Sequence, residues 1–274
     1  MVFALTSGRS GTLFLYALLR RNLPDAVVMH EPTLRRGNPS MFGQPIHDHA
    51  VGNLDAVRRL LLTKRDTIAR YKAAWYIETS HAFLKSYWDL APAIFPPFKV
   101  FHLIRHPLEV ARSEANRENF IRRWHLPFRE YRADGQRHFR WALTGREPIF
   151  HEVAALSLTQ FQRYLVQWIE IENRAMDFLT RFDMASRCLT LHTPLDLNDP
   201  QLLARVFSFL DLVPSATRVS SPLVQNRTPG NPTAIGADEL QQCREVVAAL
   251  PPRYLEIFRH APYADQPWSS LLRQ

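Results

Sequence analysis

The chain has 274 residues, of which 46% are hydrophobic, and it carries a net charge of +8. This apolar content is ample for a buried core, and because no apolar run approaches 18 residues, we expect no membrane-spanning helix. With only two cysteines, Cys188 and Cys243, a disulfide framework is excluded. The positive charge suits a polyanionic ligand, although a high-GC genome also enriches arginine.

Strands and helices are predicted to alternate along the sequence. Apolar runs predict strands at 2–6, 26–30, 74–79, 99–104 and 187–191. Helices are predicted at 11–21, 54–70, 82–91, 108–117, 158–181, 200–210 and 237–249. Residues 33–53 are rich in Pro, Gly, Asn and His and are predicted to form a loop. The pattern predicts one α/β domain over 1–274, a three-layer sandwich with a central, mostly parallel sheet of about five strands flanked by helices.

A short turn joins the first predicted strand to the first predicted helix and reads Ser7-Gly8-Arg9-Ser10-Gly11-Thr12. Its glycines let the backbone approach a ligand, and the helix N-terminus favours an anion there. The Arg, Ser and Thr side chains add donors for phosphate or sulfate oxygens. Because the turn lacks the Lys of G-x-x-x-x-G-K-[ST], it differs from a kinase-type loop. The alternative is a tight strand–helix connection without a ligand.

A second pair of polar residues follows the predicted strand at 99–104. Arg105 ends this strand, Pro107 suits the first turn of a helix, and Ser113 lies on that helix. A guanidinium and a hydroxyl placed in this way can hold a second phosphate at some distance from the first. The alternative is that Arg105 forms a surface ion pair and that Ser113 only packs within the helix.

Together, the segment 6–12 and the Arg105-x7-Ser113 pair resemble the sulfotransferase superfamily that uses 3′-phosphoadenosine 5′-phosphosulfate (PAPS). The resemblance implies a P-loop NTPase-like sulfotransferase fold, PAPS as sulfuryl donor and 3′-phosphoadenosine 5′-phosphate (PAP) as product. It implies that the 5′-phosphosulfate is held by Ser7, Gly8, Arg9, Ser10, Gly11 and Thr12, and the 3′-phosphate by Arg105 and Ser113. Cytosolic small-molecule members usually have Lys in the first loop, so Arg9 is more similar to carbohydrate-type and bacterial members.

Sulfuryl transfer needs a cation near the leaving group and a base for the acceptor hydroxyl. Arg9 is the candidate for the first role because its charge persists at all working pH values. The resemblance implies Glu31, which precedes Pro32 after the second strand, as the base of the arginine-loop branch. His81, after the third strand, matches the base of the cytosolic branch. We expect Glu31 to act as base, and His81 to act as base or to orient the acceptor; the supporting candidates are His30 and Glu78.

Arginine and aromatic residues are interleaved over 117–152. In this superfamily the segment after the Arg-x7-Ser helix often shapes the acceptor site, so the resemblance implies an acceptor-site lid inserted at about 117–157. The alternative is a helical excursion whose aromatic residues pack inward and whose arginines are solvated. A weaker resemblance, in the polar loop 225–232, implies that Arg227 contacts the 3′-phosphate.

The resemblance thus implies an enzyme that moves a sulfuryl group from PAPS to a hydroxyl of a carbohydrate or other small molecule, by in-line general-base catalysis. No metal-ligand motif is present in the sequence, and no metal is expected. Golgi-type members carry an N-terminal membrane span, and this sequence has no apolar run long enough for one. We therefore expect a cytoplasmic, bacterial protein, and we expect it to bind no nucleic acid. The alternatives are a P-loop nucleotide-dependent kinase and a non-catalytic nucleotide- or nucleic-acid-binding protein.

Overall fold

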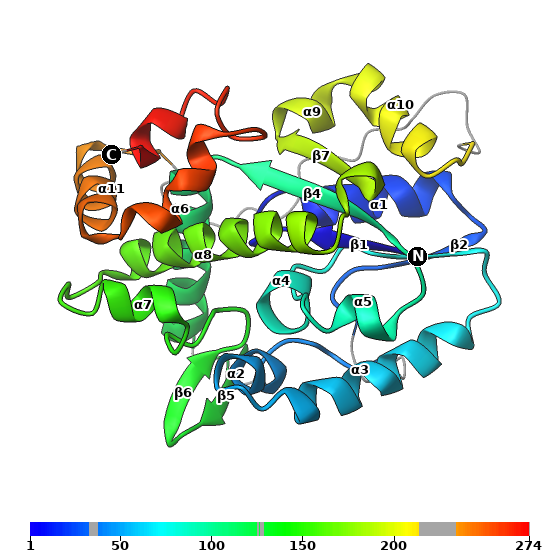
Figure 1. The fold of residues 1–274 in the computed structure, drawn as a ribbon, viewed down its shortest axis with the longest axis horizontal. Helices are drawn as coiled ribbons and strands as arrows, with labels where there is room; N and C mark the ends of the chain where they lie inside the picture. The colour runs from blue at the N-terminus through cyan, green and yellow to red at the C-terminus, as the bar shows by residue number, and fades with distance from the viewer. Residues whose placement is uncertain (33–37, 125, 127–128, 214–233, 274) are drawn as a thin grey trace.

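A five-stranded sheet forms the middle layer of the molecule (Figure 1). The computed structural model describes residues 1–32, 38–124, 126, 129–213 and 234–273, and Arg227 lies outside these ranges. The sheet has the order β2-β3-β1-β4-β7, formed by Ala26–Met29, Trp75–Glu78, Val2–Leu5, Lys99–Arg105 and Cys188–Thr193. All four neighbouring pairs are parallel. The predicted fold class and its five strands are therefore confirmed.

Helices cover both faces of the sheet because successive strand residues point to opposite sides. Val2 belongs to the core beneath one face, which is covered by α1 (Thr12–Asn22), α9 (Leu195–Asn198) and α10 (Pro200–Phe209). Phe3 belongs to the core beneath the other face, where the covering helices are α3 (Leu54–Ala69), α4 (Phe83–Ser86), α5 (Ala91–Ile94), α6 (Pro107–Arg123) and α8 (Gln160–Arg181), and α11 (Ala237–Ala249) packs against α8. In Figure 1, α8 lies in front of the strands and α1 behind them.

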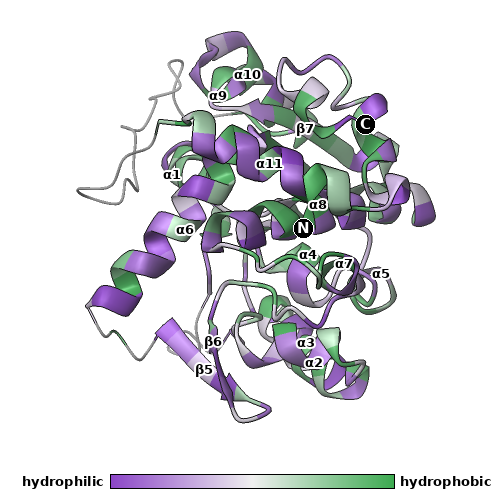
Figure 2. Cartoon of the chain, turned by 90° about the vertical axis from the view of Figure 1, so that its left-hand side faces the viewer, coloured by the Kyte–Doolittle hydropathy of each residue, from purple (hydrophilic) through white to green (hydrophobic). Residues whose placement is uncertain are grey.

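Some elements of the middle of the chain were not predicted. The segment predicted as a loop at 33–53 contains α2 (Gln44–Ala50), whose Pro45, Ile46 and His47 are buried, so tertiary packing stabilises a short helix there. The region after α6 contains an antiparallel hairpin of β5 (Glu130–Ala133) and β6 (Gln136–Phe139), followed by α7 (Pro148–Glu152). Figure 2 shows this hairpin at one end of the molecule, beside α2.

Two predicted helices have the wrong bounds. Instead of one helix over 82–91, the chain forms two. The first, α4, ends at Ser86, because the next residue, Tyr87, has a non-helical φ of −158°; the second, α5, begins at Ala91, and Pro92 is tolerated in its first turn. The helix predicted at 108–117 continues to Arg123, where buried Glu118 and Ile121 extend its packed face. Residues 117–123 of the expected lid are therefore part of α6.

The longest helix, α8, has 22 residues and carries buried charged side chains, among them Glu170, Glu172 and Arg174. The helix packs in the core of a globular domain, but its surface is not uniformly apolar. Among the helices of the described ranges, none combines the length and the apolar character required to cross a bilayer.

A buried polar network lies behind the end of β3. Lys64 on α3 lies 2.6 Å from Glu78 Oε2, and neither side chain is more than 1% exposed. Tyr76 also donates to this carboxylate, and Lys64 donates to Asn38 Oδ1 at 3.0 Å. The network satisfies the buried charges and commits Glu78 to a structural ion pair, although the sequence had suggested it as a supporting catalytic candidate.

Removing the cation from this network is expected to destabilise the fold. Lys64→Met leaves the Glu78 carboxylate buried without a counter-charge, with only the Tyr76 hydroxyl as donor among the described residues. The free energy of unfolding in urea should therefore fall by about 3–5 kcal/mol. The matched control is Arg65→Met on the same helix. Arg65 forms an ion pair with Asp66, and the two side chains are 44% and 59% exposed. That variant should lose less than about 1 kcal/mol. Equal losses in the two variants would contradict this account of the network.

Candidate functional site

The turn after β1 follows a backbone path that favours glycine. Gly8, Arg9 and Gly11 have φ angles of 108°, 54° and 86°. A Cβ on Gly8 would lie 2.9 Å from Glu114 Oε1 and 3.1 Å from His81 Nδ1. A Cβ on Gly11 would lie 2.6 Å from a methyl carbon of Leu197. The two glycines are therefore required both by conformation and by the close approach of neighbouring side chains.

The N-terminus of α1 presents backbone donors at this turn. Gly11 is the N-cap and provides no side-chain cap for the first turn. The side chains of Ser7, Ser10 and Thr12 are buried, and Ser10 Oγ donates to the Gly8 carbonyl at 2.9 Å. The buried hydroxyl of Thr6 makes no hydrogen bond within the described part of the chain. Unsatisfied N–H groups at a helix start form a suitable site for an anion.

The structure joins the two sequence motifs directly. Arg9 Nε donates to Ser113 Oγ at 2.8 Å, and Arg105 Nη1 donates to the Arg9 carbonyl at 2.9 Å. The rest of the Arg105 guanidinium donates to Glu109 Oε2 at 2.8 and 3.0 Å. The ion pair that the sequence offered as the alternative for Arg105 is therefore present, together with the contact to the first motif. Arg227, the third expected phosphate contact, lies outside the described residues.

Arg9 lies in a mostly buried position between acidic and basic groups. Burial lowers the pKa of its guanidinium, and the Glu114 carboxylate opposes this shift. Because an arginine pKa starts near 12.5, Arg9 stays charged at neutral pH. It therefore supplies a permanent positive charge at the start of α1.

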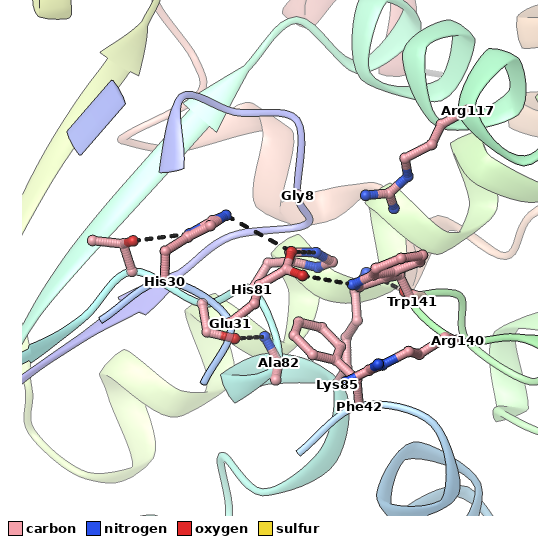
Figure 3. Close-up of polar contacts among 12 residues, drawn as sticks. Gly8, His30, Glu31, Phe42, His81, Ala82, Lys85, Arg117, Arg140 and Trp141 are labelled. Atoms are coloured by element: carbon pink, nitrogen blue, oxygen red, sulfur yellow. Dashed lines mark hydrogen bonds and ion pairs between the residues drawn. The ribbon is translucent and has the colours of Figure 1, made fainter. Parts of the chain in front are cut away.

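Glu31 and His81 lie together beside this turn (Figure 3). Glu31 Oε1 lies 3.2 Å from His81 Nε2 and 3.8 Å from His30 Nε2. Glu31 Oε2 accepts a hydrogen bond from Trp141 Nε1 at 2.9 Å. His30 is anchored on its other side, with Nδ1 3.1 Å from the Thr79 hydroxyl. Both predicted base candidates are thus brought into one cluster at the carboxyl ends of β2 and β3.

The surroundings give the two candidates different titration behaviour. Burial opposes ionisation of Glu31, but contact with His81 and the charges of His81, His30 and Arg117 outweigh it and hold the pKa of the carboxyl well below its usual range. Burial, together with the positive charge of Lys85, lowers the pKa of His81 to about 4. At neutral pH Glu31 is therefore an anion and His81 a neutral imidazole.

The imidazole of His81 is polarised by its neighbours. Because Nε2 faces the Glu31 carboxylate, we infer that the neutral ring carries its proton on Nε2, which leaves Nδ1 as the basic atom. His81 is buried, and within the described ranges neither ring nitrogen makes a hydrogen bond; Nε2 lies at ion-pair distance from Glu31, and Nδ1 has no such partner. Nδ1 faces Gly8 so closely that a Cβ there would lie 3.1 Å from it. A basic nitrogen therefore points at the turn that carries Arg9.

Glu114 and Lys85 were not singled out from the sequence, whereas Arg117 and Trp141 belong to the arginine and aromatic segment expected near the acceptor site. Glu114 is buried on α6 and is paired with Arg117, whose guanidinium stacks at 4.8 Å over the ring of Trp141. Lys85 is fully buried and donates to the Trp141 carbonyl at 2.6 Å, and burial lowers its pKa to about 7. Arg117 lies four residues after Ser113, so on a helix the two side chains share a face, and this spacing could have indicated that Arg117 lies near the site. Lys85 and Trp141 reach the cluster only through tertiary packing.

Few known proteins match this chain. No protein-family model matches the chain, and no curated protein matches it. Among solved structures, it is similar to a sulfotransferase domain from the curacin biosynthetic pathway. The TM-score is 0.47 and the identity 15%, over 84% of this chain and 80% of that chain. Such a likeness does not establish a family, so the function proposed below rests on the residues of the site. The described residues contain no group of three or more His, Cys, Asp or Glu side chains placed to hold a metal ion.

The lowered pKa of His81 predicts a pH dependence of stability. Because the folded state binds the His81 proton only near pH 4, the unfolded chain takes up more protons as the pH falls from 7 to 5, and stability is lost. The contribution of His81 over this range is on the order of 2 kcal/mol. His81→Gln should therefore flatten the dependence of the unfolding free energy on pH, measured by urea denaturation at pH 7, 6 and 5. A slope identical to that of the wild type would show that His81 titrates normally.

Proposed function

We propose that this protein transfers a sulfuryl group from PAPS to a hydroxyl of a carbohydrate or other small-molecule acceptor. The observation that carries the proposal is the contact between the two motifs, in which Arg9 bonds Ser113 and Arg105 bonds the Arg9 carbonyl. One site thereby combines a helix N-terminus, two guanidinium groups and a hydroxyl beside the His81–Glu31 pair. This set of groups suits a donor with two separate phosphate positions.

The residues fit such a donor. The turn from Gly8 to Thr12 leads into a helix start that lacks a side-chain cap, where a 5′-phosphosulfate is favoured. Arg105 and Ser113 would hold the 3′-phosphate, and Arg105 would then share its donors between that phosphate and Glu109. An arginine can serve both because its guanidinium carries five N–H groups.

The geometry supports His81 as the base and Glu31 as the residue that positions it. Both carboxylate oxygens of Glu31 face donors, one towards His81 and one towards Trp141, and its low pKa makes it a weak proton acceptor. His81 Nδ1 is unpartnered among the described residues and faces the turn. The sequence left both Glu31 and His81 open as the base. This assignment makes His81 the base and Glu31 a positioning residue.

The reaction then divides between the two sides of the site. Bound PAPS would supply the sulfuryl group: the acceptor oxygen bonds to sulfur while the bond from sulfur to the 5′-phosphate oxygen breaks, and PAP leaves. Arg9 and the first N–H groups of α1 stabilise the negative charge that develops on the leaving side. His81 Nδ1 accepts the proton of the attacking hydroxyl, and the Glu31 carboxylate stabilises the imidazolium that forms.

Binding of PAP is expected to depend on the second motif. By calorimetry, the wild type should bind PAP, and Arg105→Ala should weaken that binding by about 10–100-fold, because a charge-assisted contact to phosphate is lost. The matched control is Arg181→Ala, which removes an exposed arginine at the far end of α8. Its affinity for PAP should equal that of the wild type.

ATP with magnesium is the competing ligand in the same titration. A preference for ATP with magnesium would favour the kinase alternative. Binding of neither nucleotide, together with salt-sensitive binding of DNA or RNA, would favour the non-catalytic alternative. Either result would overturn the proposal.

The two members of the base pair are expected to respond differently to substitution. With labelled PAPS and an acceptor from a panel of sugars and phenols, His81→Gln should lower kcat by about 10²–10⁴-fold without changing PAP affinity. Glu31→Gln should lower kcat less and shift the acidic limb of the pH profile to lower pH, since the carboxylate raises the pKa of His81. A larger loss in Glu31→Gln than in His81→Gln would instead assign the base to Glu31.

A further inference from the structure

A separate cavity of about 410 Å³ lies next to the proposed transfer site. It is bounded by the second half of α6, by β6 and the residues after it, and by the first two turns of α8. We call it the hairpin pocket; its lining includes Glu118, Arg122, His138, Phe139, Phe150 and Arg163. Its volume is within the range of small-molecule sites. Most of its lining residues belong to the segment 117–157, for which the resemblance implies an acceptor-site lid, and the proposed transfer step does not use the cavity.

The hairpin pocket shares a wall with the transfer site. Phe139 lines the pocket, and the Arg117 guanidinium stacks over both Phe139, at 5.5 Å, and Trp141, at 4.8 Å. Trp141 in turn donates to Glu31. Along α6, Glu118 of the pocket is one turn, or about 6 Å, beyond Glu114 at the Gly8 turn. A ligand in the pocket therefore lies directly behind the wall of the Glu31 cluster.

The acidic groups of the pocket are already neutralised. Glu118 accepts from Arg122 Nε at 2.6 Å through one oxygen and from the Tyr164 hydroxyl at 2.7 Å through the other. Glu130, on the neighbouring strand, lies 3.7 Å from Arg122 and 3.8 Å from Arg137. The local carboxylates thus have cationic or hydroxyl partners, so they do not repel an added anion strongly.

Arg163 is a basic group of the pocket that does not pair with these carboxylates. It is exposed, and within the described ranges its guanidinium has no hydrogen bond or ion pair. The guanidinium lies 5.7 Å over the ring of Phe150, which restricts its orientation. It belongs to the first turn of the 22-residue helix α8, whose N-terminus is capped by Thr159 and Gln162. The Arg163 guanidinium is therefore the group that favours an anion at this end of the pocket.

The remaining lining suits a polyhydroxylated ligand. Gln136 and Gln160 offer amide groups, and Phe139 and Phe150 offer aromatic faces. Burial and the nearby charge of His47 lower the pKa of His138, so its ring is neutral at pH 7 and can both donate and accept. Amide, imidazole and aromatic groups around one cavity can bind hydroxyls and the apolar face of a sugar ring together.

We propose that the hairpin pocket binds an anionic sugar unit, bearing a carboxylate or a sulfate ester, and that Arg163 is its anion-binding residue. The further statement that this unit is part of the acceptor rests on the proposed function. In that case the acceptor is an acidic saccharide whose charged part is held at Arg163.

The test uses D-glucuronate and the neutral methyl glucoside as probes, in ligand-observed NMR titrations with the full chain. Glucuronate should bind the wild type about tenfold more tightly than the glucoside, and Arg163→Gln should abolish this difference. The matched control is Arg181→Gln, at the other end of the same helix and about 27 Å away along its axis. It should keep the preference for glucuronate, and thermal melting should confirm that both variants are folded.

Equal affinity for the two probes in the wild type, or an unchanged preference in Arg163→Gln, would overturn the assignment of the pocket. PAP affinity is measured on the same variants and should be unchanged in Arg163→Gln, because the residue is remote from the donor turn. If PAP does not bind the wild type while the glucuronate preference depends on Arg163, the pocket assignment stands and the proposed transfer function fails.

Discussion

The site depends on the adjacency of β1 and β4 in the parallel sheet. The register places Ala4 opposite Phe101 and Leu5 opposite His102, so the turn after β1 and the helix after β4 begin at the same edge. This adjacency lets Arg9 reach Ser113, over a sequence separation of 104 residues, and lets Arg105 reach the Arg9 carbonyl. Without this strand order the two motifs proposed to hold the donor would lie on different parts of the sheet.

A second constraint is the mutual compensation of buried charges around that edge. Glu31, Glu114, Lys85 and Arg117 lie within one cluster, with His81 neutral among them. Burying any of these charges alone would be costly, so each is tolerated because an opposite charge or a hydrogen-bond donor is nearby. The same arrangement gives the site its chemical asymmetry, with a permanent cation on the turn and an unprotonated imidazole facing it.

The sequence was sufficient for the sheet and for the residues on its carboxyl edge. Continuous apolar runs and the glycine turn identify β1 to β4 and β7, and strand ends place Arg9, Glu31, His81 and Arg105 on one side of the sheet. The hairpin was missed because its strands have only four residues each and are mostly polar, although Asp134-Gly135 at its turn, with φ angles of 50° and 72°, is a recognised hairpin signal.

The rest of the site could not be predicted because it depends on tertiary packing. Trp141 contacts Glu31 across 110 residues, and Lys85 is positioned by a backbone carbonyl that no sequence pattern identifies. The assignment of the base also needed geometry, since only the contacts of Glu31 show that both its oxygens are engaged while His81 Nδ1 faces the turn.

A crystal structure of the protein with PAP would test the central claim most directly. The account predicts the 5′-phosphate at the N-terminus of α1, against the turn from Gly8 to Thr12, and the 3′-phosphate within hydrogen-bond distance of Arg105 and Ser113. It also predicts that His81 Nδ1 faces the side of the 5′-phosphate from which an acceptor would approach. PAP bound elsewhere, or with its phosphates away from these residues, would contradict the account.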